Sequence, residues 1–336
     1  MERIRVILAA HGEPETAGLA DHFKVSWRTL GHASEVMGLS APMRLAICTA
    51  AAVRKRIAGD PGSIHNKNTR SQAKALQEAL QKHPQARYNV QPAFASAPPY
   101  LEETIDLPNE VDRQVVLNMI PTDSRLSCGL MCHSLLEASA SVRERTAVLS
   151  RLWDDPQLIA IHCAHIAAHF PHGEPDKPIC LILVLHGTLV QDRQGQKPGF
   201  HTGEEEKTVY GDALRSALLA MPERSWQRVE IAYLNHGVGG RWSSPSLSEL
   251  LSRLERDGVQ SAVAYACEHL VDGGETRQIE QLLAAGRIAK TWRLPCLNDS
   301  QALVEFLAAR VRAAATAQRT ALCCDPCPLH ASHNLK

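Results

Sequence analysis

Two short apolar runs, each ended by a His-Gly pair, constrain the fold of this chain more than any other feature. Residues 5–10 read RVILAA before His11-Gly12, and residues 179–185 read ICLILVL before His186-Gly187. Runs this short and this apolar are typical of strands buried on both faces of a parallel sheet. About half of the chain separates the two runs, so we expect two α/β halves of one architecture.

Helical and strand patterns alternate through both halves. The first half is expected to contain a helix over 68–83, a strand over 88–95, a helix over 101–107 and a strand over 114–120. The second is expected to contain helices over 204–221, 246–257, 275–285 and 300–315 and strands over 228–234 and 260–266, and residues 142–169 a mostly helical stretch interrupted near Pro156. This order favours parallel sheets covered by helices, with ligands binding beyond the carboxyl ends of the strands.

Length and composition support two domains. At roughly 150 residues per domain, 336 residues with 44% apolar content are enough for two cores. The turn-rich segment from Pro171 to Pro175 favours a boundary between them. The predicted organisation is an N-terminal domain over 1–148, an interdomain helix and linker over 149–177, a catalytic domain over 178–316 and a Cys-rich tail over 317–336.

Charge and cysteine content exclude several classes of function. The 36 Lys and Arg balance the 36 Asp and Glu, so the chain has no net positive charge that would attract nucleic acid or another polyanion. The opening MERIRVILAAHG has no long apolar leader, and no uncharged apolar stretch reaches ~18 residues. We therefore expect a cytoplasmic protein whose ten cysteines are thiols or metal ligands rather than disulfides.

The residues that follow the predicted strands are the candidates for chemistry. His11 and His186 each end a strand at its carboxyl edge, although a strand-end histidine is often purely structural. The segment from Cys267 to Thr276 also follows a strand, and two interpretations of it are open. Asp272 and Glu275 have the spacing of a helix capping box. Alternatively, Glu275 and His186 bring a carboxylate and a base to one cleft, where they take protons or hold a divalent metal.

Further candidates are a histidine row, an aromatic residue and a cysteine cluster. His162, His165 and His169 fall on one helical face, which favours either a metal site or a solvated face. Trp242 follows a strand and could stack on a flat ligand or lie in the core. Cys323, Cys324 and Cys327 supply three thiolates, so an iron–sulfur or zinc site needs a fourth ligand, from Cys128 or Cys132. The alternative is a tail with reactive thiols and no cluster.

Several segments, in order along the chain, resemble ferrochelatases, the enzymes that insert ferrous iron into a porphyrin. The segments that carry the resemblance are RVILAAHGEPET, NTRSQAKALQ, VQPAFASAPPYLEETI, IPTDSRLSC, LVLHGT, VEIAYLNHGVGGRWSSPSL and VDGGETRQIE. Each is a weak motif alone, and their shared order makes them fairly specific.

The resemblance implies a fold and a set of site residues. The expected fold is two Rossmann-like domains with parallel sheets, with the active site and the porphyrin in the cleft between them. His186 and Glu275 are implied as the catalytic pair and the metal ligands, with Asp272 in support. The residues implied to contact the porphyrin are His11, Trp242 and Phe200.

The resemblance also implies partners. The substrates are Fe2+ and a porphyrin, either protoporphyrin IX or coproporphyrin III, in haem biosynthesis. Some members hold a [2Fe–2S] cluster, for which Cys128, Cys323, Cys324 and Cys327 are the implied ligands, with Cys132 as a substitute. Contact with a membrane surface and the oligomeric state stay open, and no nucleic-acid partner is expected.

Two rival functions remain open. The first is a cobalt or nickel chelatase that acts on a sirohydrochlorin-like tetrapyrrole. The second is a non-catalytic haem- or iron-binding sensor on the same fold, with the cysteines as a redox switch.

Overall fold

The computed structural model describes residues 1–37, 39–57, 62–82, 86–107, 111–171, 179–236 and 239–316. These residues form two compact units. The first comprises Met1–Arg151, Gly199–His201 and the described residues from Asp299 onward; the second comprises Leu152–Pro198 and Thr202–Asn298.

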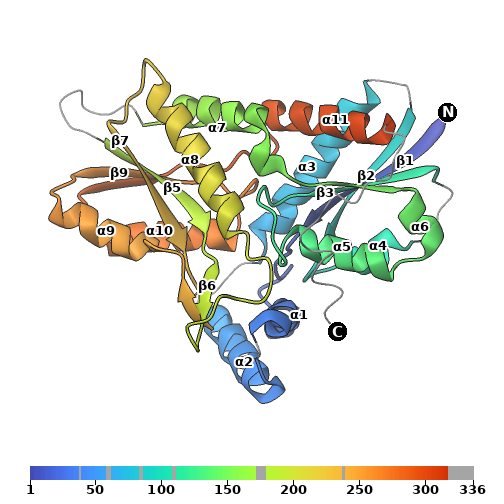
Figure 1. The fold of residues 1–336 in the computed structure, drawn as a ribbon, viewed down its shortest axis with the longest axis horizontal. Coiled ribbons are helices and arrows are strands. Elements are labelled where there is room, and N and C mark those ends of the chain that lie inside the picture. Colours follow the sequence, from blue (N-terminus) through green and yellow to red (C-terminus); the bar gives the residue numbers. More distant parts are fainter. Residues whose placement is uncertain are drawn as a thin grey trace. The chain divides into compact units, whose positions relative to one another are not determined.

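The first unit is built on a four-stranded parallel sheet (Figure 1). Its strand order is β2 (Ala86–Phe94), β1 (Glu2–Ala10), β3 (Arg113–Asn118) and β4 (Thr146–Leu149). Its helices are α1 (Leu19–Met37), α2 (Ala41–Ile57), α3 (Ile64–Gln81), α4 (Leu101–Ile105), α5 (Cys128–Glu137), α6 (Ala140–Glu144) and α11 (Gln301–Thr316). Helices α4 and α5 pack on the sheet face that carries Ile7, Ala9 and Val116, while α3 and α11 contact each other and the sheet.

The second unit has the same kind of sheet, in the order β10 (Lys290–Arg293), β9 (Ser261–Ala266), β5 (Ile179–His186) and β7 (Arg228–Leu234). All its neighbouring strands are parallel. The further elements are a 3₁₀ turn (Leu152–Asp154), α7 (Pro156–His169), α8 (Glu204–Ala220), α9 (Leu247–Arg256), α10 (Gly274–Ala285) and an antiparallel pair of β6 (Leu189–Asp192) and β8 (Gly240–Trp242).

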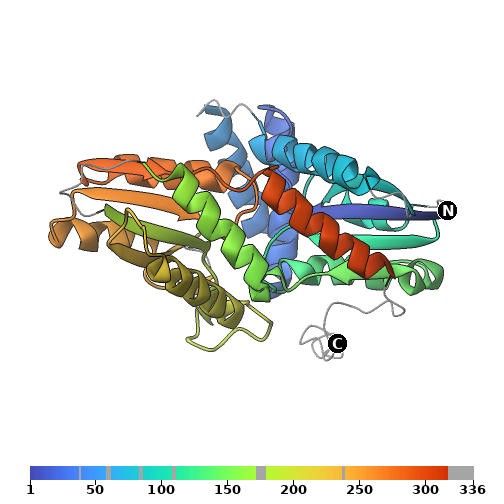
Figure 2. The same cartoon turned by 90° about the horizontal axis from the view of Figure 1, so that it is seen from above.

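Strand β5 lies between β9 and β7 in the sheet, and helices cover both of its faces. Leu181, Leu183 and Leu185 pack with α7 and α8, whereas Ile182 and Val184 pack with α9 and α10. The four helices lie on the two faces of the sheet, as Figures 1 and 2 show. This double cover explains the uninterrupted apolar run of β5, since alternate side chains of a strand point to opposite faces.

The predicted α/β class with parallel sheets is confirmed, and several details differ from the prediction. Residues 142–169 contain strand β4 in addition to helices, because TAVL pairs with β3. Pro156 begins α7, capped by Asp155, rather than interrupting a helix. Helix α11 packs on α3, β3 and β4 of the first unit, although the sequence pattern placed residues 301–316 in the C-terminal domain. Residues 172–178 and 317–336 lie outside the described residues, and the domain boundaries stay predictions.

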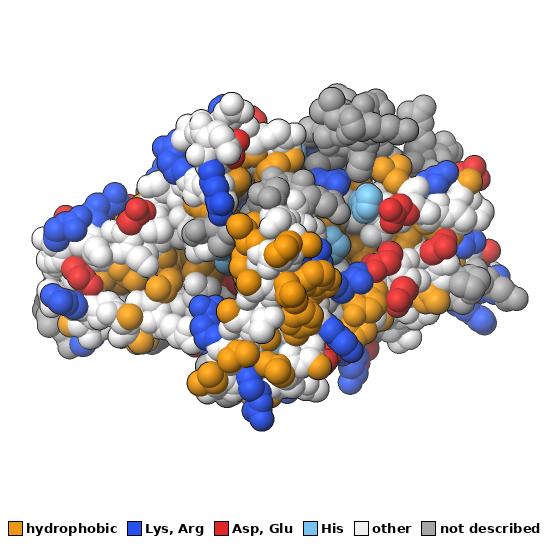
Figure 3. Space-filling view, turned by 90° about the horizontal axis from the view of Figure 1, so that it is seen from below, with side chains coloured by type: hydrophobic (Ala, Val, Ile, Leu, Met, Phe, Trp, Pro, Cys, Tyr) orange, Lys and Arg blue, Asp and Glu red, His pale blue; other side chains and the backbone are white. Residues whose placement is uncertain are grey.

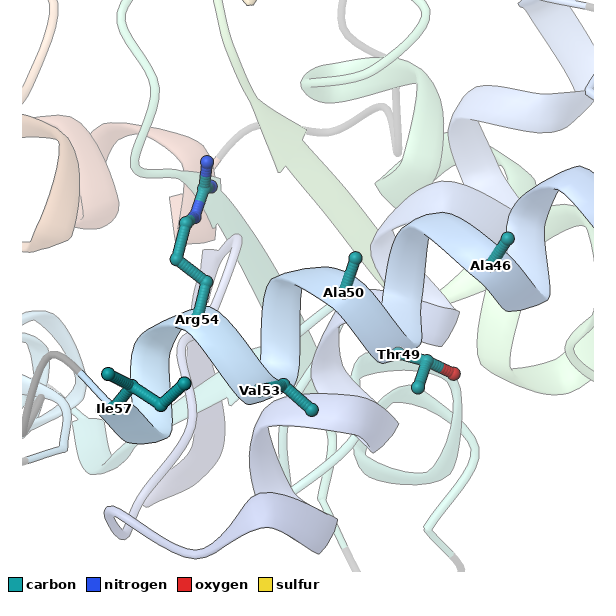
Figure 4. Close-up of a pocket in the computed structure, with 6 residues that line it drawn as sticks. All are labelled: Ala46, Thr49, Ala50, Val53, Arg54 and Ile57. Carbon is teal, nitrogen blue, oxygen red and sulfur yellow. The ribbon is translucent and has the colours of Figure 1, made fainter.

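Helix α2 leaves an apolar face exposed. Ala46, Ala50, Val53 and Ile57 recur at helical spacing and, with Thr49 and Arg54, line a groove of about 690 Å³ (Figure 4). Hydrophobic side chains gather over this part of the first unit, with Lys and Arg beside them (Figure 3). No helix among the described residues is long and apolar enough to cross a bilayer.

Candidate metal-binding site

The site starts at the carboxyl end of β5, where His186 is the last paired residue, opposite Leu234 of β7. Gly187 follows, and its N–H donates to the Leu234 carbonyl at 2.8 Å. A Cβ at position 187 would lie 1.9 Å from Asn235 Oδ1 and 2.9 Å from Leu234 O. Only glycine fits at this close approach of two chain segments, which accounts for the second His-Gly pair.

Gly187→Ala is therefore expected to move the segment that carries His186. Overpacking at a site without space costs about 1–3 kcal/mol of the free energy of unfolding, and the shift should also weaken divalent metal binding. Gly199→Ala is the matched control, because a Cβ at Gly199 meets nothing within 4 Å. Thermal unfolding and Co2+ titration of both variants test this prediction, and a parental melting temperature and affinity in Gly187→Ala would contradict it.

Three side chains from different elements converge beside this strand end. They are His186, His236 from the loop after β7, and Glu275 in the first turn of α10; their ligand atoms all lie within 4.8 Å of one another. The two Nε2 atoms are 2.9 Å apart, and Glu275 Oε1 lies 3.4 Å from His186 Nε2 and 3.5 Å from His236 Nε2. Two ligands at about 2.1 Å from one ion, at tetrahedral or octahedral angles, are about 3.0–3.4 Å apart. The spacing therefore fits one divalent cation.

The orientation of His186 leaves its Nε2 available. Its Nδ1–H donates to the Gly187 carbonyl at 2.7 Å, so Nε2 of the neutral ring carries a lone pair. His236 Nε2–H then donates to this lone pair. A metal ion would replace that proton, because both Nε2 atoms must be deprotonated to bind it.

Electrostatics keep the carboxylate of Glu275 ionised. Burial works toward a higher pKa, but the neighbouring imidazoles of His186, His236 and His269 hold the pKa of Glu275 well below its usual range. The closest of these partners is His269 Nε2, at 2.5 Å from Glu275 Oε2. Burial lowers and the Glu275 carboxylate raises the pKa of His236 and of His269, and the net shift of both is upward. The group therefore combines one anionic ligand, the Glu275 carboxylate, with two imidazole bases, His186 and His236.

Trp242 lies beside this group. Its ring centroid is 5.7 Å from that of His236, with the rings nearly perpendicular. Strand β8 carries Trp242, and its antiparallel partner β6 follows His186 closely in the chain. The aromatic side chain thus borders the candidate metal ligands rather than lying in either core cluster of the unit.

The capping-box interpretation of Asp272 and Glu275 is wrong. The N-cap of α10 is Gly273, whose N–H donates to Thr276 Oγ1 at 3.0 Å. The Asp272 carboxylate instead accepts from Arg293 Nη1 at 2.6 Å, Asn298 Nδ2 at 2.7 Å and the Cys296 N–H at 3.3 Å. Asp272 therefore ties the start of α10 to the segment after β10, and its supporting role in catalysis stays a prediction.

Among the described residues, the histidine row of α7 is not a group whose ligand atoms are spaced for a metal ion, and protein groups accept from or donate to four of its six ring nitrogens. His162 is fully buried between Tyr265 and Tyr210, at 2.6 Å and 2.8 Å from their hydroxyls. Burial, with a smaller contribution from His165, lowers the pKa of His162 to about 3. His165 Nε2 donates to the Pro295 carbonyl and His169 Nδ1 to the His165 carbonyl.

The remaining predicted residues that the structure describes lie in the first unit. His11 Nε2 is 3.2 Å from Thr29 Oγ1, and Phe200 is half-buried; their contact with a porphyrin stays a prediction. Cys128 and Cys132 lie one turn apart on α5 and are both buried. The other predicted cluster ligands, Cys323, Cys324 and Cys327, lie outside the described residues.

Sequence reasoning missed two members of the site. His236 comes two residues after the end of β7, at the same sheet edge as His186, so applying the strand-end rule to β7 finds it. His269 lies within the segment already selected after β9. Its partnership with Glu275 depends on the turn between them, which no sequence pattern indicates.

Comparison with known proteins assigns this chain to a family. The model of the Ferrochelatase family matches residues 3–315. A protein described as ferrochelatase from Opitutus terrae is 27% identical over 150 residues, which cover 42% of this chain and 42% of that protein, less than half of its length.

Solved structures show the same fold. SirB from Bacillus subtilis with Fe3+ aligns with a TM-score of 0.53 and 12% identity over 94% of this chain and 96% of that one. The multi-domain protein DR2241 from Deinococcus radiodurans, described as similar to chelatases, aligns with a TM-score of 0.50 and 13% identity over 96% of this chain and 56% of that one. With the family match over nearly the whole chain, these findings show that this chain belongs to the ferrochelatase family.

Proposed function

We propose that the protein is a ferrochelatase that inserts Fe2+ into a porphyrin, protoporphyrin IX or coproporphyrin III. The observation that carries this proposal is the group of His186, His236 and Glu275, whose spacing suits one divalent ion. Two imidazoles and one carboxylate are a donor set that suits ferrous iron. Membership of the ferrochelatase family supports the reaction class.

The reaction exchanges one ferrous ion for the two pyrrole protons of the macrocycle. Nε2 of His186, Nε2 of His236 and Oε1 of Glu275 would hold the incoming Fe2+ and replace part of its water shell. As the ion leaves these side chains for the four pyrrole nitrogens, the freed imidazole nitrogens and carboxylate can accept the released protons. The hydrogen bond from His269 keeps Glu275 Oε2 fixed while Oε1 exchanges its partner.

The macrocycle is expected to contact the aromatic and imidazole side chains beside the metal ligands. Trp242 supplies a flat apolar surface next to His236. His11 and Phe200 are proposed as further porphyrin contacts on the basis of the sequence resemblance.

A metal and tetrapyrrole matrix tests the proposal. Fe2+, Co2+ and Ni2+ are each offered anaerobically with protoporphyrin IX, coproporphyrin III and sirohydrochlorin, and product spectra are recorded. We expect the highest kcat/KM for Fe2+ with one of the two porphyrins. Preference for sirohydrochlorin would identify a cobalt- or nickel-type chelatase instead. Tight haem binding without insertion of any metal would identify a sensor.

The other predicted partners remain proposals. A [2Fe–2S] cluster would be held by Cys323, Cys324 and Cys327 with Cys128, or Cys132 in its place. Helix α5 carries both internal thiols, one turn apart. Such a cluster supplies a cross-link and a one-electron redox group when bound.

For a membrane contact, the candidate surface is the exposed apolar face of α2, a helix that ends in basic residues.

A further inference from the structure

The main chain of His186 is held by two charged side chains that lie outside the metal-ligand group. The His186 N–H donates to Glu268 Oε2 at 2.8 Å, and Lys207 Nζ donates to the His186 carbonyl at 3.0 Å. Lys207 Nζ and Glu268 Oε1 are 3.5 Å apart, and the two side chains are only 7% and 2% exposed. Two hydrogen bonds and one ion pair therefore form a closed ring that runs from the His186 N–H through Glu268 and Lys207 to the His186 carbonyl.

The sheet explains why side chains take this role. Pairing between β5 and β9 ends with Val184 opposite Ala266, and the Cys267 N–H donates to the Val184 carbonyl. The His186 N–H lies past that point, where β9 has turned away from the strand. The carboxylate of Glu268 takes the place that a strand carbonyl would fill. On the opposite edge, β7 still pairs with His186.

Stability alone is a weak reason for burying this ion pair. Removing two charges from water costs several kcal/mol per ion, so a buried ion pair is often no more stabilising than apolar residues of the same volume. Its hydrogen bonds to His186 are charge-assisted and roughly twice as strong as neutral ones. Together with the bond from His186 Nδ1 to the Gly187 carbonyl, they restrict both the backbone and the ring of His186.

We propose that Lys207 and Glu268 are positioning residues that fix His186 so that its Nε2 faces the metal ion. This inference rests on the proposed function, because it assigns the pair to the metal-binding step. Neither side chain supplies a ligand atom to the group of His186, His236 and Glu275. Loss of groups that orient a metal ligand typically weakens metal affinity 10–100-fold.

The decisive variant is the double substitution Lys207→Met with Glu268→Leu. A single substitution leaves one buried charge without its partner, which destabilises the protein for reasons unrelated to His186. The double variant removes both charges and both contacts while keeping apolar volume. Tyr210→Phe is the matched control, because Tyr210 lies one turn after Lys207, is fully buried and donates to the Cys267 carbonyl.

Three measurements are made on the full chain: thermal unfolding, Co2+ affinity from visible absorption, and the tautomer of His186 from ¹⁵N NMR without metal. We expect the double variant to unfold near the parental temperature, to bind Co2+ at least 10-fold more weakly and to lose the single Nδ1–H tautomer. Tyr210→Phe should keep the parental affinity and tautomer even where it unfolds earlier.

Parental Co2+ affinity and tautomer in a folded double variant would overturn the proposal. Should that variant not fold, Lys207→Met and Glu268→Gln are compared with Tyr210→Phe, and equal affinity in all three would overturn it as well. Co2+ binding that is absent from the parent protein, or unaffected by His186→Ala, would instead contradict the proposed metal site. The tautomer measurement still tests the positioning role in that case.

Discussion

Glu275→Gln is expected to lower the rate of metal insertion by about 100-fold or more. The amide keeps the volume of the side chain but cannot be an anionic ligand or a proton acceptor. Helix α10 should form as before, because its first turn is capped by Gly273 and Thr276. The loss should therefore appear in kcat and in Fe2+ affinity, with an unfolding temperature close to that of the parent.

The pH dependence gives this prediction a second readout. Glu275 raises the pKa of His236 and of His269, and a protonated His236 cannot bind a metal. Metal binding by the parent should weaken as the pH falls through the raised pKa of His236, above the ordinary value near 6.5. In Glu275→Gln this acid-side loss of metal binding should occur at lower pH than in the parent. At alkaline pH, where His236 is neutral, the variant should still bind the metal more weakly than the parent, because it lacks the anionic ligand.

Glu280→Gln is the matched control for this variant. Glu280 lies on the same helix, is half exposed and pairs with Arg293 away from the ligand group. It should keep the parental rate and pH profile. A Glu275→Gln enzyme with the parental rate would exclude the carboxylate from the reaction, and an unshifted pH limb would exclude its effect on His236.

The strands that carry the site could be predicted from the sequence. The apolar runs predicted over 179–185 and 260–266 correspond to β5 and β9 within one residue at each end. Both strands are covered on two faces, so their interior positions are apolar and the apolar run ends where the chain reaches the edge of the sheet. His186 is therefore recognisable as a strand-end residue from its position in the sequence.

Other elements show no such pattern in the sequence. Strands β4 and β10 have four residues each, too few to show a period. Helix α2 packs on α1 and exposes apolar residues to solvent, so no core-facing stripe distinguishes it. The three predicted histidines of α7 share a helical face, yet Tyr210 and Tyr265, the hydrogen-bond partners of His162, come from distant segments. Spacing alone cannot show which groups satisfy a side chain.

His186→Ala is expected to abolish metal insertion while leaving porphyrin binding largely intact. Removing the ring leaves two of the three ligand atoms, and a carboxylate with one imidazole holds a divalent ion far less tightly. The porphyrin would lose only a small part of its contact area. The main chain at position 186 keeps its bonds to Glu268 and Lys207, and the Gly187 N–H keeps its bond to the Leu234 carbonyl, so the strand end should stay folded.

Three measurements decide this prediction: single-turnover insertion of Fe2+, quenching of porphyrin fluorescence on binding, and rescue by added imidazole. Imidazole can enter the space left by the ring and restore one neutral nitrogen ligand, so partial recovery of the rate is expected. His133→Ala is the control, since His133 is a partly exposed residue of α5 that pairs with Glu137. Near-parental turnover in His186→Ala would remove His186 from the mechanism. A loss of porphyrin binding as large as the loss of turnover would mean that the ring acts on the macrocycle rather than on the metal, and the donor set would then have to be built on His236 and Glu275 alone.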